Sequence, residues 1–462
     1  MLAAAVICAV AASLRSPAAR HAIEPLFMQV HITNPLSGIS SADLGLMLSG
    51  AATGFRSFGG PDAPARIFAD ARIADNLRKT YPDLKCKTLS FDDDPIISDR
   101  GFLGISDARG LRPCFKILSI DGTLPWGRVH DDGNLEKDGA PYPFIMAGAE
   151  KWDPNAHSTI VQTGVTAMTR AFIAAVDRSG DILSPVRYTM KITTPADLAT
   201  TSNEVSFLEP CTYPLKNPMV FCSPVRFFKI LSESGFDVIE LTGNHNNDFS
   251  SRYNMESIGM LERAGMRYFG GGRNKQDAEQ VRYIAVKDAT VAFIGFNEPG
   301  PETAFAAENR AGAARLSLET FVRSIREAAG KADIIIVTVQ WGNEDGPIPR
   351  EIQTRYFHLA ADLGATIMVS SSAHRPMGLE FYRGRFISYG LGNFLFDQMQ
   401  SLNHRRGLIA RHHLYRGRHV ATELIPYCIH DWSQPRISTG RDARAIMEEV
   451  FRRSIGPVFR RP

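Results

Sequence analysis

Residues 237–249 read DVIELTGNHNNDF, in which an apolar run typical of a buried β-strand ends in five consecutive polar side chains. A helical pattern begins directly afterwards, near Ser250 and Ser251. In α/β sheets, ligands bind in the loops that follow the carboxyl ends of strands. One helix cap needs a single Asn or Asp, but this loop carries three Asn and one Asp. We therefore expect a functional site here rather than a simple turn.

Strand-like and helical patterns alternate on both sides of this loop. Further apolar, β-branched runs lie at 159–164, 283–286, 291–296, 333–339, 366–369 and 385–389. Apolar residues spaced three or four positions apart, as on one face of a helix, precede Gly235, Gly265, Gly330 and Gly364. Glycine is a typical residue at the end of a helix. A hairpin is predicted around Arg416-Gly417. This pattern predicts an α/β layered domain with mixed sheets, preceded by a smaller α/β or α+β region.

Length and composition limit the domain plan and the class of partner. A chain of 462 residues is long enough for two or three domains. Turn formers at 151–155 separate an irregular, Gly/Pro-broken region from the alternating one, so we predict domains at 1–150 and 151–435 and a C-terminal helix and tail at 436–462. A net charge of +3 argues against a nucleic-acid-binding protein, and six cysteines are too few for a disulfide scaffold.

Two other loops follow predicted strands and carry polar side chains. In the loop at 337–346, Gln340 and Glu344 are expected to face a pocket that Trp341 walls, and the alternative is a solvated loop with Trp341 covering the core edge. In the loop at 369–376, three serines precede His374 and Arg375. A histidine there can ligate a metal, and an arginine can bind a phosphate or carboxylate.

The order of these motifs resembles the capsule-synthesis CapA family. The matching residues are Asn-His-x-x-Asp-Phe from Asn244, Trp-Gly-x-Glu from Trp341, the pair Ala373-His374, and GLGNFLFD at 390–397, within a match over about 159–430. The resemblance implies a metallophosphoesterase-like sandwich and a part in capsule or poly-γ-glutamate synthesis or attachment. It also implies an acidic polymer or a phosphorylated or glycan substrate, a membrane-associated polymer-synthesis complex as partner, and an exported or cell-envelope location.

The resemblance further implies a site for a divalent cation, Mn, Zn or Mg, and the departures described below leave room for at most one ion. Its predicted metal ligands are Glu204, Asn244, His245 and His374. His245 would be catalytic with Asp248 orienting it, and the predicted substrate-binding residues are Gln340, Trp341, Arg375 and Asn393. We expect these loops to converge on one site.

Several positions depart from the family pattern and weaken the metal site. Gly164 stands where the family usually has Asp, Gln340 where it has His, and Ser371 and Ser372 where it has further His residues. The site is therefore either a degenerate one-metal hydrolase or a non-catalytic module that binds an acidic polymer or glycan. Replacing Gly164 with Asp should raise metal affinity, provided that the backbone there accepts a side chain.

The N-terminal region and the cysteines support further expectations. Leu2–Leu14 resembles the apolar core of a signal peptide but lacks a preceding basic residue, so it is either an export signal or a buried helix. Residues 103–107, 115–122 and 142–144 resemble the closing part of a periplasmic solute-binding domain, which implies a remnant lobe. Cys211 and Cys222 bracket a short loop and either form a disulfide or remain reduced; Cys86 and Cys114 are a second candidate pair. No apolar run reaches the length that spans a bilayer.

Overall fold

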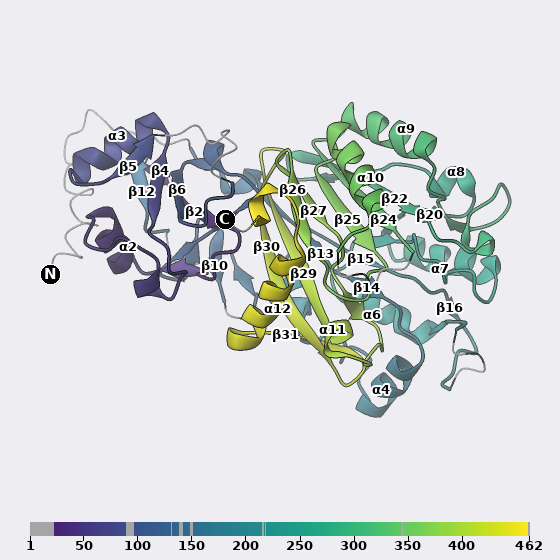
Figure 1. Ribbon diagram of the computed structural model, residues 1–462. Helices are drawn as coiled ribbons and strands as arrows, with labels where there is room; N and C mark the ends of the chain where they lie inside the picture. Colours follow the sequence, from purple (N-terminus) through teal and green to yellow (C-terminus); the bar gives the residue numbers. More distant parts are fainter. Residues whose placement is uncertain are drawn as a thin grey trace. The chain divides into compact units, whose positions relative to one another are not determined.

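The structure is a computed structural model that describes residues 23–88, 97–130, 132–137, 142–147, 151–214, 217, 219–342, 346 and 348–460. The chain forms two compact units, one built mainly from residues 1–157 and one mainly from residues 158–456. Each unit has its own sheets and helices (Figure 1).

The N-terminal unit is a small α/β unit around a five-stranded mixed sheet. The sheet order is β5 (Cys86–Thr88), β4 (Arg66–Ala69), β6 (Phe102–Ser106), β2 (Phe27–His31) and β7 (Phe115–Ile117). β2 and β6 are buried along their whole length because both faces are covered. Helix α3 (Ala71–Thr80) packs on β4 and β5 and begins at Asp70, whose side chain accepts from Ile73 N.

The rest of the N-terminal unit consists of short elements. These are helix α2 (Ser41–Leu48), the two-stranded sheet of β1 (Ile23–Pro25) and β12 (Ile145–Ala147), and a sheet in the order β11 (Leu135–Glu136), β10 (Gly127–Val129), β9 (Thr123–Leu124), β8 (Ser119–Ile120), β3 (Gly38–Ile39). The remnant-lobe interpretation of this unit stays a prediction.

The larger unit contains two large sheets that contact each other, besides small two-stranded ones. The first has the order β19 (Arg267–Phe269), β18 (Val238–Glu240), β15 (Leu198–Ser202), β13 (His157–Gln162), β29 (Arg406–Tyr415), β30 (Arg418–His430), β31 (Gln434–Ile437). The second has the order β21 (Arg282–Val286), β22 (Ala289–Asn297), β24 (Ile334–Gln340), β25 (Ile367–Ser371), β27 (Arg385–Ser388), β26 (Leu379–Tyr382). Phe269 of the first sheet packs on Phe293 of the second, with ring centroids 5.2 Å apart.

Parallel strands in both sheets direct the loops toward the site. β13, β15, β18 and β19 are parallel in the first sheet, and β22, β24, β25 and β27 are parallel in the second. Antiparallel strands lie at the edges, with β21 beside β22 and β26 beside β27. The carboxyl ends of the parallel strands carry the loops singled out in the sequence.

Helices pack on these sheets and account for the amphipathic stripes. α7 (Ser251–Arg263) packs on β19, α9 (Leu318–Ala329) on β22 and β24, α10 (Glu351–Asp362) on β25, and α12 (Gly440–Arg453) on β26. The predicted stops after α7 and α10 are confirmed, because Gly265 and Gly364 take left-handed φ values of 73° and 111°. The remaining helices are α4 (Ala171–Ser179), α5 (Met190–Thr193), α6 (Phe228–Ser232), α8 (Lys275–Ala278) and α11 (Leu402–Arg405).

The predicted fold class is confirmed: the larger unit is an α/β layered sandwich with mixed sheets, and a smaller α/β unit precedes it in the chain. Every predicted strand and the hairpin at Arg416-Gly417 is present. In the two large sheets, β15, β19, β26 and β31 lie outside the predicted runs. Three of them are edge strands, and β15 reads LATTS, in which three hydroxyl-bearing residues weaken the apolar signal of a strand.

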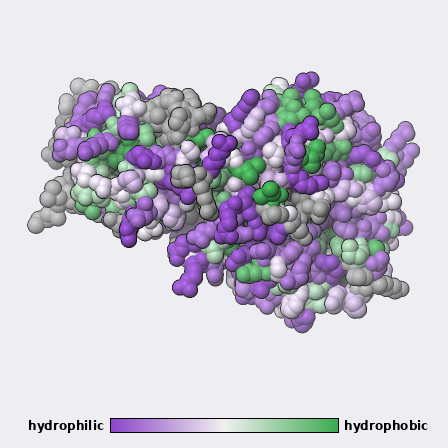
Figure 2. Space-filling view, in the orientation of Figure 1, coloured by the Kyte–Doolittle hydropathy of each residue, from purple (hydrophilic) through white to green (hydrophobic). Residues whose placement is uncertain are grey.

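No helix among the described residues is long and apolar enough to cross a membrane. Hydrophilic side chains predominate on the face drawn in Figure 2, and apolar ones gather there in small groups. The signal-like segment Leu2–Leu14 lies outside the described residues.

Candidate functional site

The loops after β15 and β18 lie directly beside each other. Val205 forms an isolated parallel bridge with His245, which extends the pairing of the two strands into the loops and sets Glu204 close to His245. Gly243 permits this approach, because a Cβ there would lie 2.5 Å from the Cα of Glu204. Glu204 and His245, predicted from separate motifs, therefore occupy one site.

His245 and Asp248 form a hydrogen-bonded pair. Nδ1 of His245 lies 2.7 Å from Oδ2 of Asp248, and both side chains are mostly buried. The same Oδ2 accepts a 2.7 Å hydrogen bond from the backbone N–H of Phe221, whose ring lies 4.1 Å from the His245 ring. A carboxylate held in this way fixes the orientation and tautomer of the imidazole.

Glu204 is a buried carboxyl with an unused oxygen. Its side chain is almost fully buried, and Oε1 has no hydrogen-bond partner among the described residues. Burial raises the pKa of Glu204 to about 7; His245 opposes this shift and Asp248 adds to it. Near neutral pH Glu204 therefore exchanges a proton easily, which suits either acid–base chemistry or cation binding.

The loop after β24 reaches the same place through Gln340. Its Nε2 donates a 2.7 Å hydrogen bond to Oδ1 of Asn244. Trp341 is fully buried in the core and packs against Tyr356 and Phe357 at 5.7 and 6.0 Å, so its ring presents no surface to a substrate in this structure. Glu344 lies outside the described residues.

The loop after β25 brings His374 to the block at 390–397. Nδ1 of His374 lies 2.9 Å from Oδ1 of Asn393. Asn393 is fully buried, and its Nδ2 donates to the carbonyl of His374 at 3.0 Å. These bonds make Asn393 a positioning residue for His374. The substrate contacts predicted for Asn393 and Trp341 stay predictions.

Arg375 and Ser372 give this loop an unusual character. Ser372 takes a left-handed φ of 71°, a conformation that non-glycine residues adopt at a cost. Nε of Arg375 is buried without a partner among the described residues. Burial lowers the pKa of Arg453; Glu449, which pairs with it at 2.6 Å, opposes this shift and the nearby Arg375 adds to it, so Arg453 already has a carboxylate partner.

Aromatic side chains connect the His245 and His374 loops. Phe221 lies 6.2 Å from Phe396, and Phe396 lies 5.5 Å from the His374 ring. The guanidinium of Arg170 stands over both phenylalanine rings and pairs with Asp397 at 2.5 Å. The two histidine loops are therefore joined through a small apolar cluster.

Glu240 is a candidate site residue that the sequence motifs did not single out. It ends β18, is fully enclosed, and accepts a 3.0 Å hydrogen bond from Ser371 of the other sheet and one from Thr242. Burial raises the pKa of Glu240 to about 8, and Glu204 adds to the shift. The sequence did contain a sign of Glu240, a single carboxyl inside the apolar run Val238–Leu241. Burying an ionised carboxyl there costs free energy, so a protonated one is expected.

A small cavity of about 20 Å³, enough for about one water molecule, adjoins Glu240. Seven hydroxyl-bearing side chains line it: Thr163, Thr200, Thr201, Ser202, Thr338, Ser370 and Ser371. Gly164 also lines it, and a Cβ at Gly164 would lie 1.8 Å from the carbonyl oxygen of Gly392. The backbone does not accept a side chain here, so the expected gain in metal affinity from Gly164→Asp is corrected; the obstacle is space, not a left-handed φ.

The predicted metal ligands do not form a complete cation site. In the described part of the chain, no three His, Cys, Asp or Glu side chains come together closely enough to hold a metal ion. Asn244 Oδ1 is already bonded to Gln340, and the carboxylate position at Gly164 is closed by Gly392. Glu204 with His245 supplies two ligands of the four usual for zinc. The donor set thus does not fit a metal centre in this conformation.

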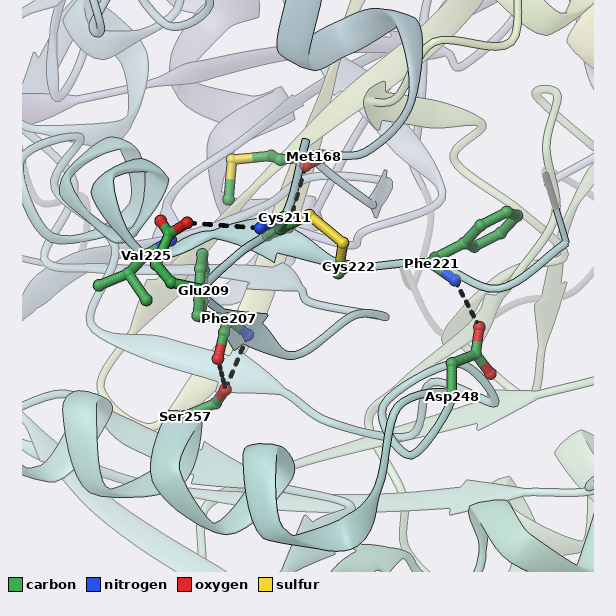
Figure 3. Close-up of a disulfide and its surroundings, with 10 residues drawn as sticks. Met168, Phe207, Glu209, Cys211, Phe221, Cys222, Val225, Asp248 and Ser257 are labelled. Carbon is green, nitrogen blue, oxygen red and sulfur yellow. Dashed lines mark hydrogen bonds between the residues drawn. A yellow bond between two sulfur atoms is a disulfide. The ribbon is translucent and has the colours of Figure 1, made fainter. Parts of the chain in front are cut away.

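The structure decides both cysteine alternatives. Cys211 and Cys222 form a disulfide with Cα atoms 6.0 Å apart, inside the range of about 4.4–6.8 Å usual for disulfides (Figure 3). The second predicted pair is wrong: Cys86 and Cys114 are both free thiols. Each is buried in the N-terminal unit, where it packs as a small apolar side chain.

Replacing Glu240 with Gln is expected to raise thermal stability at pH 8.5 relative to wild type and to change it little at pH 5. A folded-state pKa of about 8, above the ordinary 4.5, means that stability is lost as pH rises between these values. Glutamine does not titrate and keeps an acceptor for Thr242. Melting curves at both pH values measure the effect, with Glu319→Gln on the exposed face of α9 as control. An identical melting difference at both pH values would show that Glu240 ionises normally.

A match to a sequence-family model identifies the family of the chain. The model of the bacterial capsule synthesis protein PGA_cap matches residues 159–398, just over half of the chain. The chain belongs to this capsule synthesis family. The matched residues include the loops of Glu204, His245, Gln340 and His374, so the candidate site lies within the family region.

Two curated members of the capsule synthesis family are similar over about half of each chain. The capsule biosynthesis protein CapA of Bacillus anthracis is 26% identical over 226 residues, which cover 48% of this chain and 55% of the relative. The PGA biosynthesis protein CapA of Bacillus subtilis is 29% identical over 204 residues, which cover 44% and 53%. The chain spans about half the length of the curated relatives it matches.

Solved structures give weaker likenesses. A phosphatase from Mycoplasma pneumoniae matches 59% of this chain and 94% of its own with 12% identity and a TM-score of 0.38. A phosphate transporter substrate-binding protein from Clostridium perfringens matches 23% of this chain and 49% of its own with 14% identity and a TM-score of 0.21. Both TM-scores are too low to support a conclusion about the activity of this chain.

Proposed function

We propose that this protein takes part in capsule or poly-γ-glutamate synthesis or attachment, and that its site holds an anionic segment of the polymer rather than hydrolysing it with a metal. The observation that carries the proposal is the state of Arg375, whose Nε is buried without a partner beside His374. The names of the two Bacillus relatives, which refer to capsule and PGA biosynthesis, agree with such a ligand. A guanidinium whose Nε–H has no partner among the described residues, next to an imidazole, suits a carboxylate.

The buried carboxyls support anion binding near neutral pH. With pKa values of about 7 and 8, Glu204 and Glu240 are partly or mostly protonated there. They therefore add little negative charge beside an incoming carboxylate. The hydroxyl-lined cavity supplies neutral hydrogen-bonding groups rather than metal ligands. This combination favours a binding site for an acidic chain.

A second candidate function is a one-metal hydrolase. The unpartnered Oε1 of Glu204 beside the His245–Asp248 pair favours it, because a carboxylate and an oriented imidazole are common ligands and acid–base groups. A third ligand would have to move into place. The two functions predict opposite responses to pH, since ionised carboxyls repel an anionic polymer but attract a cation.

Titration calorimetry with a γ-glutamate oligomer tests the proposal. We expect binding at pH 6 without added metal, and weaker binding as pH rises through about 7 and 8 while Glu204 and Glu240 ionise. Arg375→Gln should lower affinity about 10- to 100-fold, the worth of a charge-assisted hydrogen bond. Arg383→Gln is the matched control, because that arginine is exposed and paired with Asp362.

The opposite result is equally clear. Binding that requires Mn²⁺, is abolished by a chelator and strengthens toward pH 9 would overturn the polymer-binding proposal and support the metal hydrolase. If Arg375→Gln binds the oligomer with wild-type affinity, Arg375 does not bind the ligand. Hydrolysis of a generic phosphodiester, measured with and without Mn²⁺, separates the two functions independently of affinity.

A further inference from the structure

The disulfide and the His245–Asp248 pair are connected through one residue. Phe221 immediately precedes Cys222. Its N–H donates to Asp248 (Figure 3), and its ring lies against the ring of His245. Phe221 thus contacts both members of the pair, one through its backbone and one through its ring. Any change in the position of Cys222 acts directly on this residue.

The disulfide ties the Phe221 segment to a fixed part of the sheet unit. Cys211 follows β16 (Phe207–Leu208), and Cys222 precedes β17 (Ser223–Pro224), which pairs with β16 in parallel. Phe207 N donates to Ser257 of α7 at 2.8 Å, so β16 is anchored to that helix. The bond closes the 11-residue separation between the two cysteines next to this anchor.

Among the described residues between the cysteines, Phe221 is also held by its contacts with Phe396 and the guanidinium of Arg170, but the middle of the loop is exposed. Tyr213 and Met219 expose large apolar surfaces, with 49% and 67% of their area accessible, so they bury little area. Glu209 accepts hydrogen bonds from the backbone of Cys211 and Val225 at 3.3 and 2.9 Å, outside the loop's exposed part. The covalent closure removes conformations from the unbonded chain, and it adds to the 3.0 Å hydrogen bonds that Ser223 donates to the carbonyls of Ser206 and Met168.

We propose that formation of the Cys211–Cys222 disulfide is what seats Phe221 against His245 and Asp248, so that the site becomes competent only in an oxidising compartment. The step is a thiol–disulfide exchange with a disulfide-bearing oxidant. Two thiols lose two protons and two electrons as the S–S bond forms, and the oxidant's own S–S bond breaks to give two thiols. Both cysteines are about 1% exposed, so the bond, once formed, is shielded from dithiols. The dependence therefore lies in maturation rather than in a reversible switch.

Hydrogen exchange at the Phe221 amide tests the inference without any ligand. In the oxidised protein this amide should exchange slowly, because it donates to Asp248. In the double variant Cys211→Ser, Cys222→Ser it should exchange at least about 10-fold faster. The amide of Ile335 is the internal control, since it also donates to a side-chain oxygen, Thr366 Oγ1, but lies in the other sheet. Cys428→Ser, which removes a free thiol, should match wild type.

A second arm measures ligand affinity and rests on the proposed function. The double variant, and separately Phe221→Leu with the disulfide intact, should bind the γ-glutamate oligomer about 10-fold more weakly than wild type. If the double variant folds and its Phe221 amide still exchanges slowly, the inference is overturned. If the double variant does not fold, an affinity in Phe221→Leu equal to that of wild type overturns it instead. If wild type binds no oligomer, the proposed function fails, while the amide result still decides the role of the disulfide.

Discussion

Replacing Gly164 with alanine is expected to destabilise the larger unit by at least about 3 kcal/mol, because the new methyl group has no room. Its Cβ would lie 1.8 Å from the carbonyl oxygen of Gly392. That carbonyl accepts the N–H of Val165 at 2.9 Å, where β14 (Val165–Thr166) pairs in parallel with β28 (Asn393–Leu395). The substitution must therefore separate these strands and disturb Asn393, which positions His374. Denaturant unfolding and oligomer binding measure both effects.

Gly330→Ala provides the matched control for Gly164→Ala. Gly330 follows α9, has a φ of −87°, and a Cβ there would meet only the carbonyl oxygen of Glu327 at 3.9 Å. We expect its stability to stay within about 0.5 kcal/mol of wild type. A Gly164→Ala protein as stable as this control would show that β14 and β28 can separate freely, and would reopen the question of a carboxylate at this position.

Replacing Glu423 with Gln is expected to cost about 3–5 kcal/mol, the usual effect of breaking a buried ion pair. Glu423 of β30 accepts from Arg411 at 2.8 Å and from His413 at 2.9 Å, and both of these β29 side chains are fully buried. Burial alone would raise the pKa of Glu423, but Arg411 and His413 outweigh it and hold the pKa at about 2. Loss of the charge leaves Arg411 buried beside a neutral amide.

The acid limb of the stability profile gives an independent check on Glu423. A pKa lowered from 4.5 to about 2 means that the wild-type contribution is present above pH 4.5 and is lost as pH falls toward 2. The difference in unfolding free energy between wild type and Glu423→Gln should therefore shrink over that range. Asp362→Asn, which removes an exposed pair with Arg383, should cost under about 1 kcal/mol. Equal costs for the two variants would contradict the buried-pair argument.

Local patterns were sufficient for the strands that line the site and for several of its residues. Apolar runs ending in polar residues located His245, Asp248, Gln340 and His374, because a buried strand must leave the core where its side chains become polar. The spacing of Cys211 and Cys222 around a short loop likewise pointed to a bond that the structure contains. These signals lie within single segments of about ten residues.

Contacts between distant segments decided what these residues can do, and no single segment of sequence carries that information. Trp341 is fully buried because α10 covers it, although its motif suggested a pocket wall. Glu240 keeps its proton because the surrounding core buries it, although the hydrogen bond from Ser371 of the other sheet opposes this rise in pKa. Gly164 excludes a carboxylate because Gly392, 228 positions further along the chain, approaches its Cα. Residue type and periodicity determine which elements form, whereas burial, pKa and available space depend on which elements meet, and that is a property of the packed sheets.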